Sequence, residues 1–236
     1  MIIANNVTKQ FRKLKALNDF SVECHSGACI SLIGPNGSGK TTFIKSVLGM
    51  IIPDSGFITF NNQNIDKDCT YRSNIGYMPQ IGRYPDNMSI GQVIDLMKEI
   101  RMNNGTISLD EDLLNAFQIQ KITDKKMCTL SGGTRQKVSA VLAFLFNPSV
   151  LILDEPTAGL DPVASEILKE KITLEKHREK LILITSHILS DLDELVNEVI
   201  FMQEGKLIFH KEVEELKLET GEKMLGKVIA NVMSKN

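Results

Sequence analysis

Residues 34–42 read GPNGSGKTT, a glycine-rich stretch that ends in a lysine and two threonines. The first eight of these residues fit the pattern G-x-x-x-x-G-K-[ST] completely. The apolar stretch CISLI precedes them, and the segment TTFIKSVLGM begins at Thr41, so we expect a buried strand, a loop and a helix in that order. This context predicts a phosphate-binding loop in an α/β fold of the P-loop nucleoside-triphosphatase type. The alternative is a glycine-rich turn with a chance lysine.

The residue types of this loop suit a phosphate group. Its glycines permit backbone angles that a β-carbon forbids, so consecutive N–H groups can point at an anion near the positive end of a helix dipole. Lys40 can then reach the β- and γ-phosphates, and the Thr41 hydroxyl is suited to bind Mg²⁺. The predicted nucleotide-binding residues of the loop are Gly34, Asn36, Gly37, Ser38, Gly39, Lys40, Thr41 and Thr42.

Two further apolar stretches end in residues that can act on a phosphate. VLILDE places Asp154 and Glu155 at the carboxyl end of a predicted strand, where parallel sheets bind ligands. Asp154 suits a Mg²⁺ shell, and Glu155 suits a base that orients and deprotonates water. LILITSH ends at His187, which we expect to contact the γ-phosphate. Alone, such an acidic pair is also typical of a helix cap, and such a histidine of a core residue; the phosphate-binding loop favours the catalytic interpretation.

The order of periodic segments predicts one domain, 1–236, built on a mainly parallel sheet. MIIANNV and LNDFSVEC alternate apolar and polar residues, which indicates a small antiparallel sheet at the N-terminus. Helical periodicity between 81 and 146 predicts a helical subdomain inserted into the core, and 211–236 reads as a helical tail. We also expect hairpin turns at 61–62 and 204–205, and a helix that starts at Asp161 and Pro162, where proline fits the first helical turn.

The bulk composition excludes several classes of protein. With 236 residues and a net charge of -2, the chain has no excess of cations to neutralise a nucleic-acid backbone, so we expect no nucleic-acid partner. Its four cysteines show no metal-binding spacing and predict free thiols in a reducing cytoplasm. The sequence shows no signal peptide and no apolar run long enough to span a membrane. A role at a membrane would therefore need a second chain.

Residues 130–136 read LSGGTRQ, and they precede VLILDEPTAGLD at a spacing that resembles the ABC-type ATPases, the ATP-binding subunits of ABC transporters. The resemblance covers about residues 1–210 and includes five motifs in the family's order. These are the phosphate loop, Gln80 in MPQ (the Q-loop), the LSGGT signature, the D-loop that ends at Asp161, and the switch histidine His187. The resemblance implies that Gln80 binds Mg²⁺ and takes part in catalysis.

The family resemblance also implies a dimer in which each ATP lies between two chains. Ser131, Gly132 and Gly133 open a helix, so their N–H groups and the dipole can meet the γ-phosphate of ATP held by the partner. Phe11 takes the place of the family's aromatic residue that stacks on adenine, although it also fits a core phenylalanine. Thr134 replaces the family's usual glutamine, and we expect slower or retuned hydrolysis from this change.

The resemblance therefore implies a Mg²⁺-dependent ATPase that works as a homodimer or with a paired ABC ATPase and drives a separate membrane permease. That permease would dock on 81–92 and hold the chain at the cytoplasmic face of the cell membrane. The sequences of residues 77–88 and 130–148 are similar to those of the CcmA-like exporter group and of NosF-type ATPases, which are linked to copper-site maturation of nitrous-oxide reductase. The alternatives are a soluble ABC ATPase of the cluster-assembly type and a nucleotide sensor with little turnover.

Overall fold

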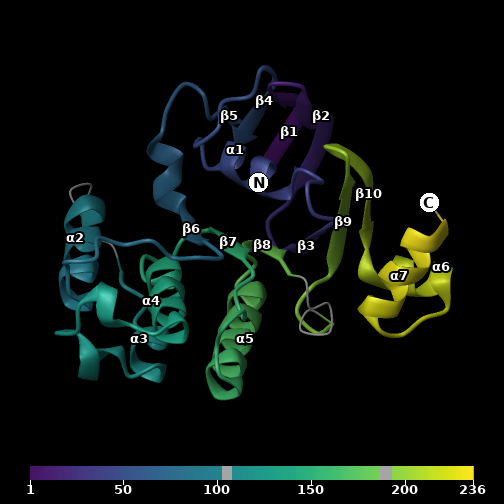
Figure 1. The fold of residues 1–236 in the computed structure, drawn as a ribbon. Helices are drawn as coiled ribbons and strands as arrows, with labels where there is room; N and C mark the ends of the chain where they lie inside the picture. The colour runs from purple at the N-terminus through teal and green to yellow at the C-terminus, as the bar shows by residue number, and fades with distance from the viewer. Residues whose placement is uncertain (103–107, 187–192, 236) are drawn as a thin grey trace. The chain divides into compact units, whose positions relative to one another are not determined.

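Figure 1 shows the chain from its N-terminus in purple to its C-terminus in yellow, and the computed structural model describes residues 1–102, 108–186 and 193–235. The described elements divide into two units. Unit 1 consists of Met1–Arg72 and the chain from Lys176 onward, and unit 2 consists of Ser73–Glu175.

Unit 1 begins with an antiparallel sheet, as predicted (Figure 1). Its strands lie in the order β2-β1-β4-β5 and each neighbouring pair is antiparallel. The turn between β4 and β5 falls at Asn61 and Asn62, which confirms the predicted hairpin. The four strands are β1 (Ile2–Phe11), β2 (Leu14–Cys24), β4 (Ser55–Phe60) and β5 (Gln63–Asn64).

Unit 1 also contains a group of mainly parallel strands. Strand β3 (Cys29–Ile33) pairs in parallel with both β8 (Leu181–Thr185) and β9 (Glu198–Gln203). All five residues of β3 are buried, as expected for a strand covered on both faces. Strand β10 (Lys206–Glu212) pairs antiparallel with β9 through the predicted turn at Glu204 and Gly205. The mainly parallel character of the fold is thereby confirmed.

The helices of unit 1 bury one face each. Helix α1 (Lys40–Val47) buries Phe43, whose ring centroid lies 4.9 Å from that of Phe20 on β2. Burial of one such ring stabilises a fold by roughly 1.5–3 kcal/mol, so this pair fixes α1 beside the antiparallel sheet. After β10 come α6 (Val213–Thr220) and α7 (Leu225–Lys235), which pack on each other at the yellow end of the chain in Figure 1.

Unit 2 contains one parallel pair of strands and most of the helices. Strand β6 (Ile75–Met78) pairs with β7 (Val150–Asp154) in a register that joins Met78 to Leu153. The helices are α2 (Ile90–Met102), α3 (Asp112–Ala116), α4 (Gly132–Phe144) and α5 (Pro162–His177), the last of which ends two residues beyond the unit. Short 3₁₀ segments are η1 (Thr70–Asn74) at the unit boundary, η2 (Ile119–Ile122) and η3 (Met127–Thr129). The subdomain bounds 81–146 and the tail bounds 211–236 stay predictions.

The start of α5 confirms the helix predicted at Asp161 and Pro162. Pro162 is its first helical residue, a position where a missing N–H costs nothing. Asp161 precedes it, and its Oδ1 accepts a hydrogen bond from the Ala164 N–H at 2.9 Å. A carboxylate in this position also interacts favourably with the helix dipole.

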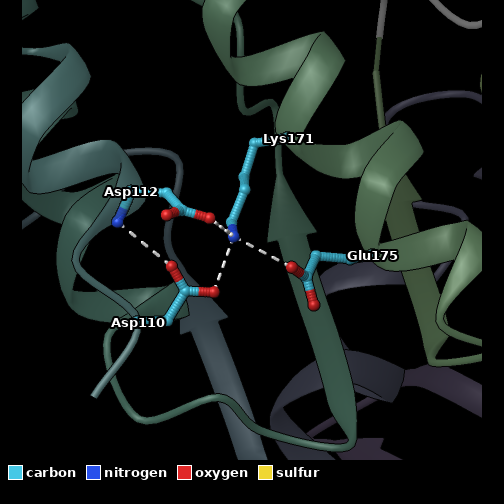
Figure 2. A network of polar contacts seen from close by, with 4 residues as sticks. All are labelled: Asp110, Asp112, Lys171 and Glu175. Carbon is cyan, nitrogen blue, oxygen red and sulfur yellow. Dashed lines mark hydrogen bonds and ion pairs between the residues drawn. The ribbon is translucent and has the colours of Figure 1, made fainter.

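A buried lysine ties the start of α3 to the middle of α5 (Figure 2). Lys171 is 5% exposed, and its ammonium donates to Asp110 at 2.6 Å and Asp112 at 2.7 Å and lies 3.0 Å from Glu175. A lysine ammonium has three hydrogens, and the three carboxylates match them in number. The cluster therefore fixes two segments of unit 2 that are far apart in the sequence.

Candidate functional site

The glycine-rich loop connects β3 to α1 in unit 1, so the predicted strand, loop and helix are confirmed as local structure. Two of its glycines are required by close backbone approaches. A β-carbon on Gly34 would lie 2.1 Å from the Met202 carbonyl oxygen, and one on Gly39 would lie 2.3 Å from that of Ala16. Both residues also have positive φ, 153° and 106°. A larger residue at either position would have to displace the strand beside it.

Lys40 is folded back over this loop. Its Nζ donates to the Gly34 carbonyl at 2.6 Å and to the Pro35 carbonyl at 3.0 Å. The ammonium thus lies against the loop's own backbone at the start of α1, a helix whose first turn holds no acidic residue. Because helix N-termini carry partial positive charge, this loop combines a cation with a favourable dipole. The arrangement fits a phosphate group.

The other loop residues differ in exposure. Asn36, Gly37 and Thr41 are exposed, whereas Ser38 is 2% exposed and its backbone is hydrogen-bonded at both its N–H and its carbonyl. The Ser38 N–H donates to Pro35 at 3.1 Å, and its carbonyl accepts from the Gly205 N–H at 3.0 Å. The loop is therefore bonded to the turn between β9 and β10.

In unit 2, Gln80 and Asp154 lie at the same edge of the parallel pair. Asp154 ends β7, and Gln80 follows β6 by two residues, while Met78 and Leu153 are in register. Burial, together with the nearby charge of Asp154, raises the pKa of Tyr77 to about 12. A carboxylate and an amide oxygen are both hard oxygen donors, so these two residue types fit Mg²⁺.

Glu155 has an unusual backbone conformation that the sequence did not predict. Its φ is +50°, in the left-handed region that non-glycine residues rarely adopt. Its carbonyl accepts hydrogen bonds from the Ala158 N–H at 3.1 Å and from Gln136 Nε2 at 3.5 Å. Gln136 is itself 5% exposed and lies on α4. These bonds offset a conformational cost of about 1–2 kcal/mol and turn the chain sharply after Asp154.

The signature segment opens α4, as predicted. Ser131 is the N-cap residue, and its Oγ accepts the Thr134 N–H at 3.2 Å. Its side chain is exposed, as is Gly132. A β-carbon on Gly133 would lie 2.8 Å from the Gly159 carbonyl, so the D-loop packs closely on this helix start. The first N–H groups of a helix have no acceptor within it, which leaves this exposed end suited to an anion.

Phe11 and His187 are the two remaining predicted residues. Phe11 ends β1 and is 45% exposed, so it is not a core side chain, and Lys9 Nζ lies 5.6 Å from its ring centroid. An exposed ring keeps a face for a nucleobase. His187 lies outside the described residues; the described chain in this region ends at Ser186, one residue after β8.

A lysine-bearing loop between a buried parallel strand and a helix, with an acidic pair at the end of a second parallel strand, defines a P-loop nucleotide-binding protein. Comparison with known proteins makes the assignment specific. The family model described as ABC transporter matches residues 17–158. The ABC transporter ATP-binding protein YtrB of Bacillus subtilis (strain 168) is 32% identical over 220 residues, which is 93% of this chain and 74% of that protein. The Nod factor export ATP-binding protein I of Burkholderia lata is 31% identical over 206 residues, 86% of this chain and 68% of that one.

Solved structures show the same fold. A structure described as the ATP binding subunit of an ABC transporter superposes with a TM-score of 0.88 at 24% identity, covering 99% of both chains. The dimeric structure of MJ0796, described as a bacterial ABC transporter cassette, has a TM-score of 0.79 at 22% identity and covers 90% of this chain and 99% of that one. The chain therefore belongs to the ABC transporter family, as one of its ATP-binding subunits. Within the described residues, none of the helices combines the length and apolar character that crossing a bilayer demands.

Proposed function

We propose that this chain binds and hydrolyses ATP as the motor subunit of an ABC transporter. The observation that supports this most directly is the loop at 34–42, where Lys40 lies at the start of α1 within a family match that spans 17–158. Nucleotide is held by the loop residues already named, with Phe11 against the base. His187 contacts the γ-phosphate.

Thr41, Gln80 and Asp154 would hold Mg²⁺, and the bound cation would neutralise charge on the phosphates. Glu155 accepts a proton from the attacking water and orients it. Its left-handed backbone supports this role, since a residue held in a rare conformation by several hydrogen bonds is often part of a reactive site. The chain's contribution is thus to grip the phosphates and to position one water molecule.

The complete site requires a second copy or a paired ABC ATPase. The exposed N-terminus of α4, with Ser131, Gly132 and Gly133, supplies the other half of each ATP site across the dimer. ATP binding closes the dimer, and hydrolysis removes the γ-phosphate that bridges the two halves. Support comes from the dimeric cassette of the same fold.

A separate permease would convert this cycle into transport and would place the chain at the cytoplasmic face of the membrane. The segment after Gln80 offers an apolar contact, since Ile81 is 67% exposed. Copurification with a multispanning membrane protein tests this partner. The NosF-type assignment and its copper-site role stay predictions, tested by whether that protein comes from a nitrous-oxide reductase system.

The replacement Glu155→Gln tests the reaction itself. It keeps the size of the side chain and removes the base, so we expect phosphate release to fall by about 10²–10⁴-fold while ATP still binds. Glu166→Gln is the matched control, because Glu166 is an exposed carboxylate on α5. Light scattering should show the Glu155→Gln chain as a dimer with ATP and as a monomer with ADP. Hydrolysis at the unaltered rate in Glu155→Gln would exclude the assigned role.

A further inference from the structure

The hydroxyl oxygen of Ser131 contacts two groups of Thr134, its backbone N–H and its hydroxyl. The Thr134 N–H donates to Ser131 Oγ at 3.2 Å, and Thr134 Oγ1 lies 2.9 Å from the same atom. The first contact is an ordinary helix N-cap. The second is an extra hydrogen bond between two hydroxyl groups, and the cap does not require it.

The direction of this extra bond decides whether the Ser131 hydroxyl can donate to another molecule. A hydroxyl oxygen has one hydrogen to donate and can accept two hydrogen bonds. If Ser131 donated to Thr134, its only hydrogen would be used inside the chain. If Thr134 donates instead, Ser131 Oγ accepts two bonds, and its own hydrogen points away from the helix. Because the Ser131 side chain is exposed, that hydrogen is available to an external acceptor.

A phosphate oxygen is an acceptor only, so it selects the second arrangement. The two hydrogen bonds then run in one direction, from the Thr134 hydroxyl to Ser131 Oγ and from the Ser131 hydroxyl to the phosphate oxygen. Each of these bonds polarises the next. Bonds that end on an anion are also the stronger ones. The threonine hydroxyl therefore makes the serine a better donor toward an anion at this helix end.

We infer that Thr134 is a positioning residue that orients the Ser131 hydroxyl as a donor to the γ-phosphate of ATP held by the partner copy. This inference rests on the proposed function, in which the start of α4 completes the partner's ATP site. Thr134 acts through Ser131 and touches no nucleotide itself.

The replacement Thr134→Val separates this role from helix capping. Valine has the shape of threonine and keeps the backbone N–H that caps through Ser131, but it has no hydroxyl. We expect KM for ATP to rise about 3–10-fold, the usual effect of one lost hydrogen bond, with kcat nearly unchanged because the contact exists before and during the reaction. Thr134→Ser restores the hydroxyl and should return KM to within about twofold of the original value.

Two more variants test whether Thr134 acts through Ser131. Ser131→Ala removes the donor and should raise KM at least as much as Thr134→Val. The double variant Ser131→Ala with Thr134→Val should equal Ser131→Ala alone, because the threonine has nothing left to orient. Thr129→Val is the control, since it removes a nearby hydroxyl that donates to the Lys126 carbonyl at 2.7 Å; its KM should not change.

A measurement that does not depend on turnover uses chains that also carry Glu155→Gln and therefore hydrolyse ATP slowly. There, the ATP concentration that gives half-maximal dimer in light scattering should rise about 3–10-fold on adding Thr134→Val. An unchanged KM and an unchanged dimer midpoint in Thr134→Val, together with a clear loss in Ser131→Ala, would overturn the inference and leave the proposed function standing. No change in Ser131→Ala would overturn the inference and would also remove Ser131 from the site proposed across the dimer. Additive effects in the double variant would also overturn the inference, because Thr134 would then act independently of Ser131.

Discussion

Lys137 and Asp161 join two helices of unit 2 by an ion pair, with Nζ 2.7 Å from Oδ2. Lys137 lies one turn into α4, and Asp161 precedes α5, where its other carboxylate oxygen caps the helix through Ala164. One carboxylate thus serves both the helix that starts at the signature and the helix that follows the acidic pair. This relationship keeps the D-loop beside the start of α4.

The first prediction concerns the titration of Asp161. The hydrogen bond from Lys137, followed by that from the Ala164 N–H, lowers the pKa of Asp161 from its ordinary value. Lys137→Met should therefore raise this pKa toward about 3.9, the ordinary value. Carbon-detected NMR titration of the Asp161 carboxyl gives the measurement. Lys125→Met, which removes an exposed lysine before η3, should leave the titration as it was.

The lowered pKa of Asp161 also predicts how the stability of the fold changes with pH. Because the folded-state pKa of Asp161 is lowered, the stability that this carboxylate supplies is present above its unfolded pKa and is lost as pH falls through the folded value. Urea unfolding between pH 6 and pH 3 should show a smaller acid loss of stability in Asp161→Asn than in the original chain. Asparagine is a suitable replacement because it still caps a helix. An equal acid loss in both chains would contradict the prediction.

A second prediction concerns nucleotide affinity. Lys40 bonds to the Gly34 and Pro35 carbonyls, so its ammonium is already positioned at the loop. Lys40→Ala removes that charge, and we expect ATP affinity to fall by about 10²-fold or more, since bonds to charged groups contribute roughly 1.5–3 kcal/mol each and phosphate offers several acceptors. Lys45→Ala is the matched control, an exposed lysine on the same helix. Calorimetric titration measures the ATP affinity of each variant. Equal affinity in Lys40→Ala and Lys45→Ala would disprove the role of Lys40.

A third prediction concerns the cluster in Figure 2. Lys171→Met removes the ammonium group that Asp110 and the fully buried Glu175 contact, so the free energy of unfolding should fall by about 3–5 kcal/mol. Urea denaturation measures this change. Lys125→Met should cost less than about 1 kcal/mol, the usual limit for an exposed charge. A loss of similar small size in Lys171→Met would show that the cluster does not hold α3 to α5.

Lys171 also predicts a loss of stability at high pH. Burial alone would lower its pKa, but the hydrogen bonds to Asp110, Asp112 and Glu175 outweigh burial and raise the pKa overall. A raised folded pKa means that this stability is fully present below the unfolded lysine value near 10.4 and is lost as pH rises through the folded value. The Lys171→Met chain should lack this alkaline component.

A fourth prediction separates the four cysteines by reactivity. Burial raises the pKa of Cys24 and of Cys29 to about 12, so neither forms much thiolate near neutral pH. Cys69 and Cys128 are exposed. Iodoacetamide at pH 8 should label Cys69 and Cys128 in the folded protein and all four cysteines in urea, as mass spectrometry of peptides can show. Rapid labelling of Cys24 in the folded chain would contradict its burial.

Local patterns in the sequence predicted the elements that carry the candidate site. The strand CISLI, the glycine loop and the helix after it lie within residues 29–47. They follow from apolar runs, glycines and a lysine over a short range in which local backbone preference decides structure. The hairpin at 204–205 and the helix start at Pro162 were predicted for the same reason. Each depends on one or two residues with narrow backbone preferences.

Features that depend on distant contacts could not be predicted in this way. Strand β1 extends to Phe11, beyond the predicted MIIANNV, because irregular pairing with β2 after Ala4 lets the strand continue past Asn6, which has φ +49°. The rare conformation of Glu155 depends partly on Gln136 from another helix. Lys171 meets Asp110 from 61 residues away, and no periodicity marks such a pair.

The bond from the Gly205 N–H to the Ser38 carbonyl has a practical consequence. Gly205 belongs to the turn between β9 and β10, outside the loop that would hold nucleotide, yet its amide hydrogen is retained only while that loop keeps its shape. Deuterium uptake at Gly205 should therefore slow when ATP orders the loop. A single backbone amide then reports occupancy without a dye, a label or a substitution near the phosphates.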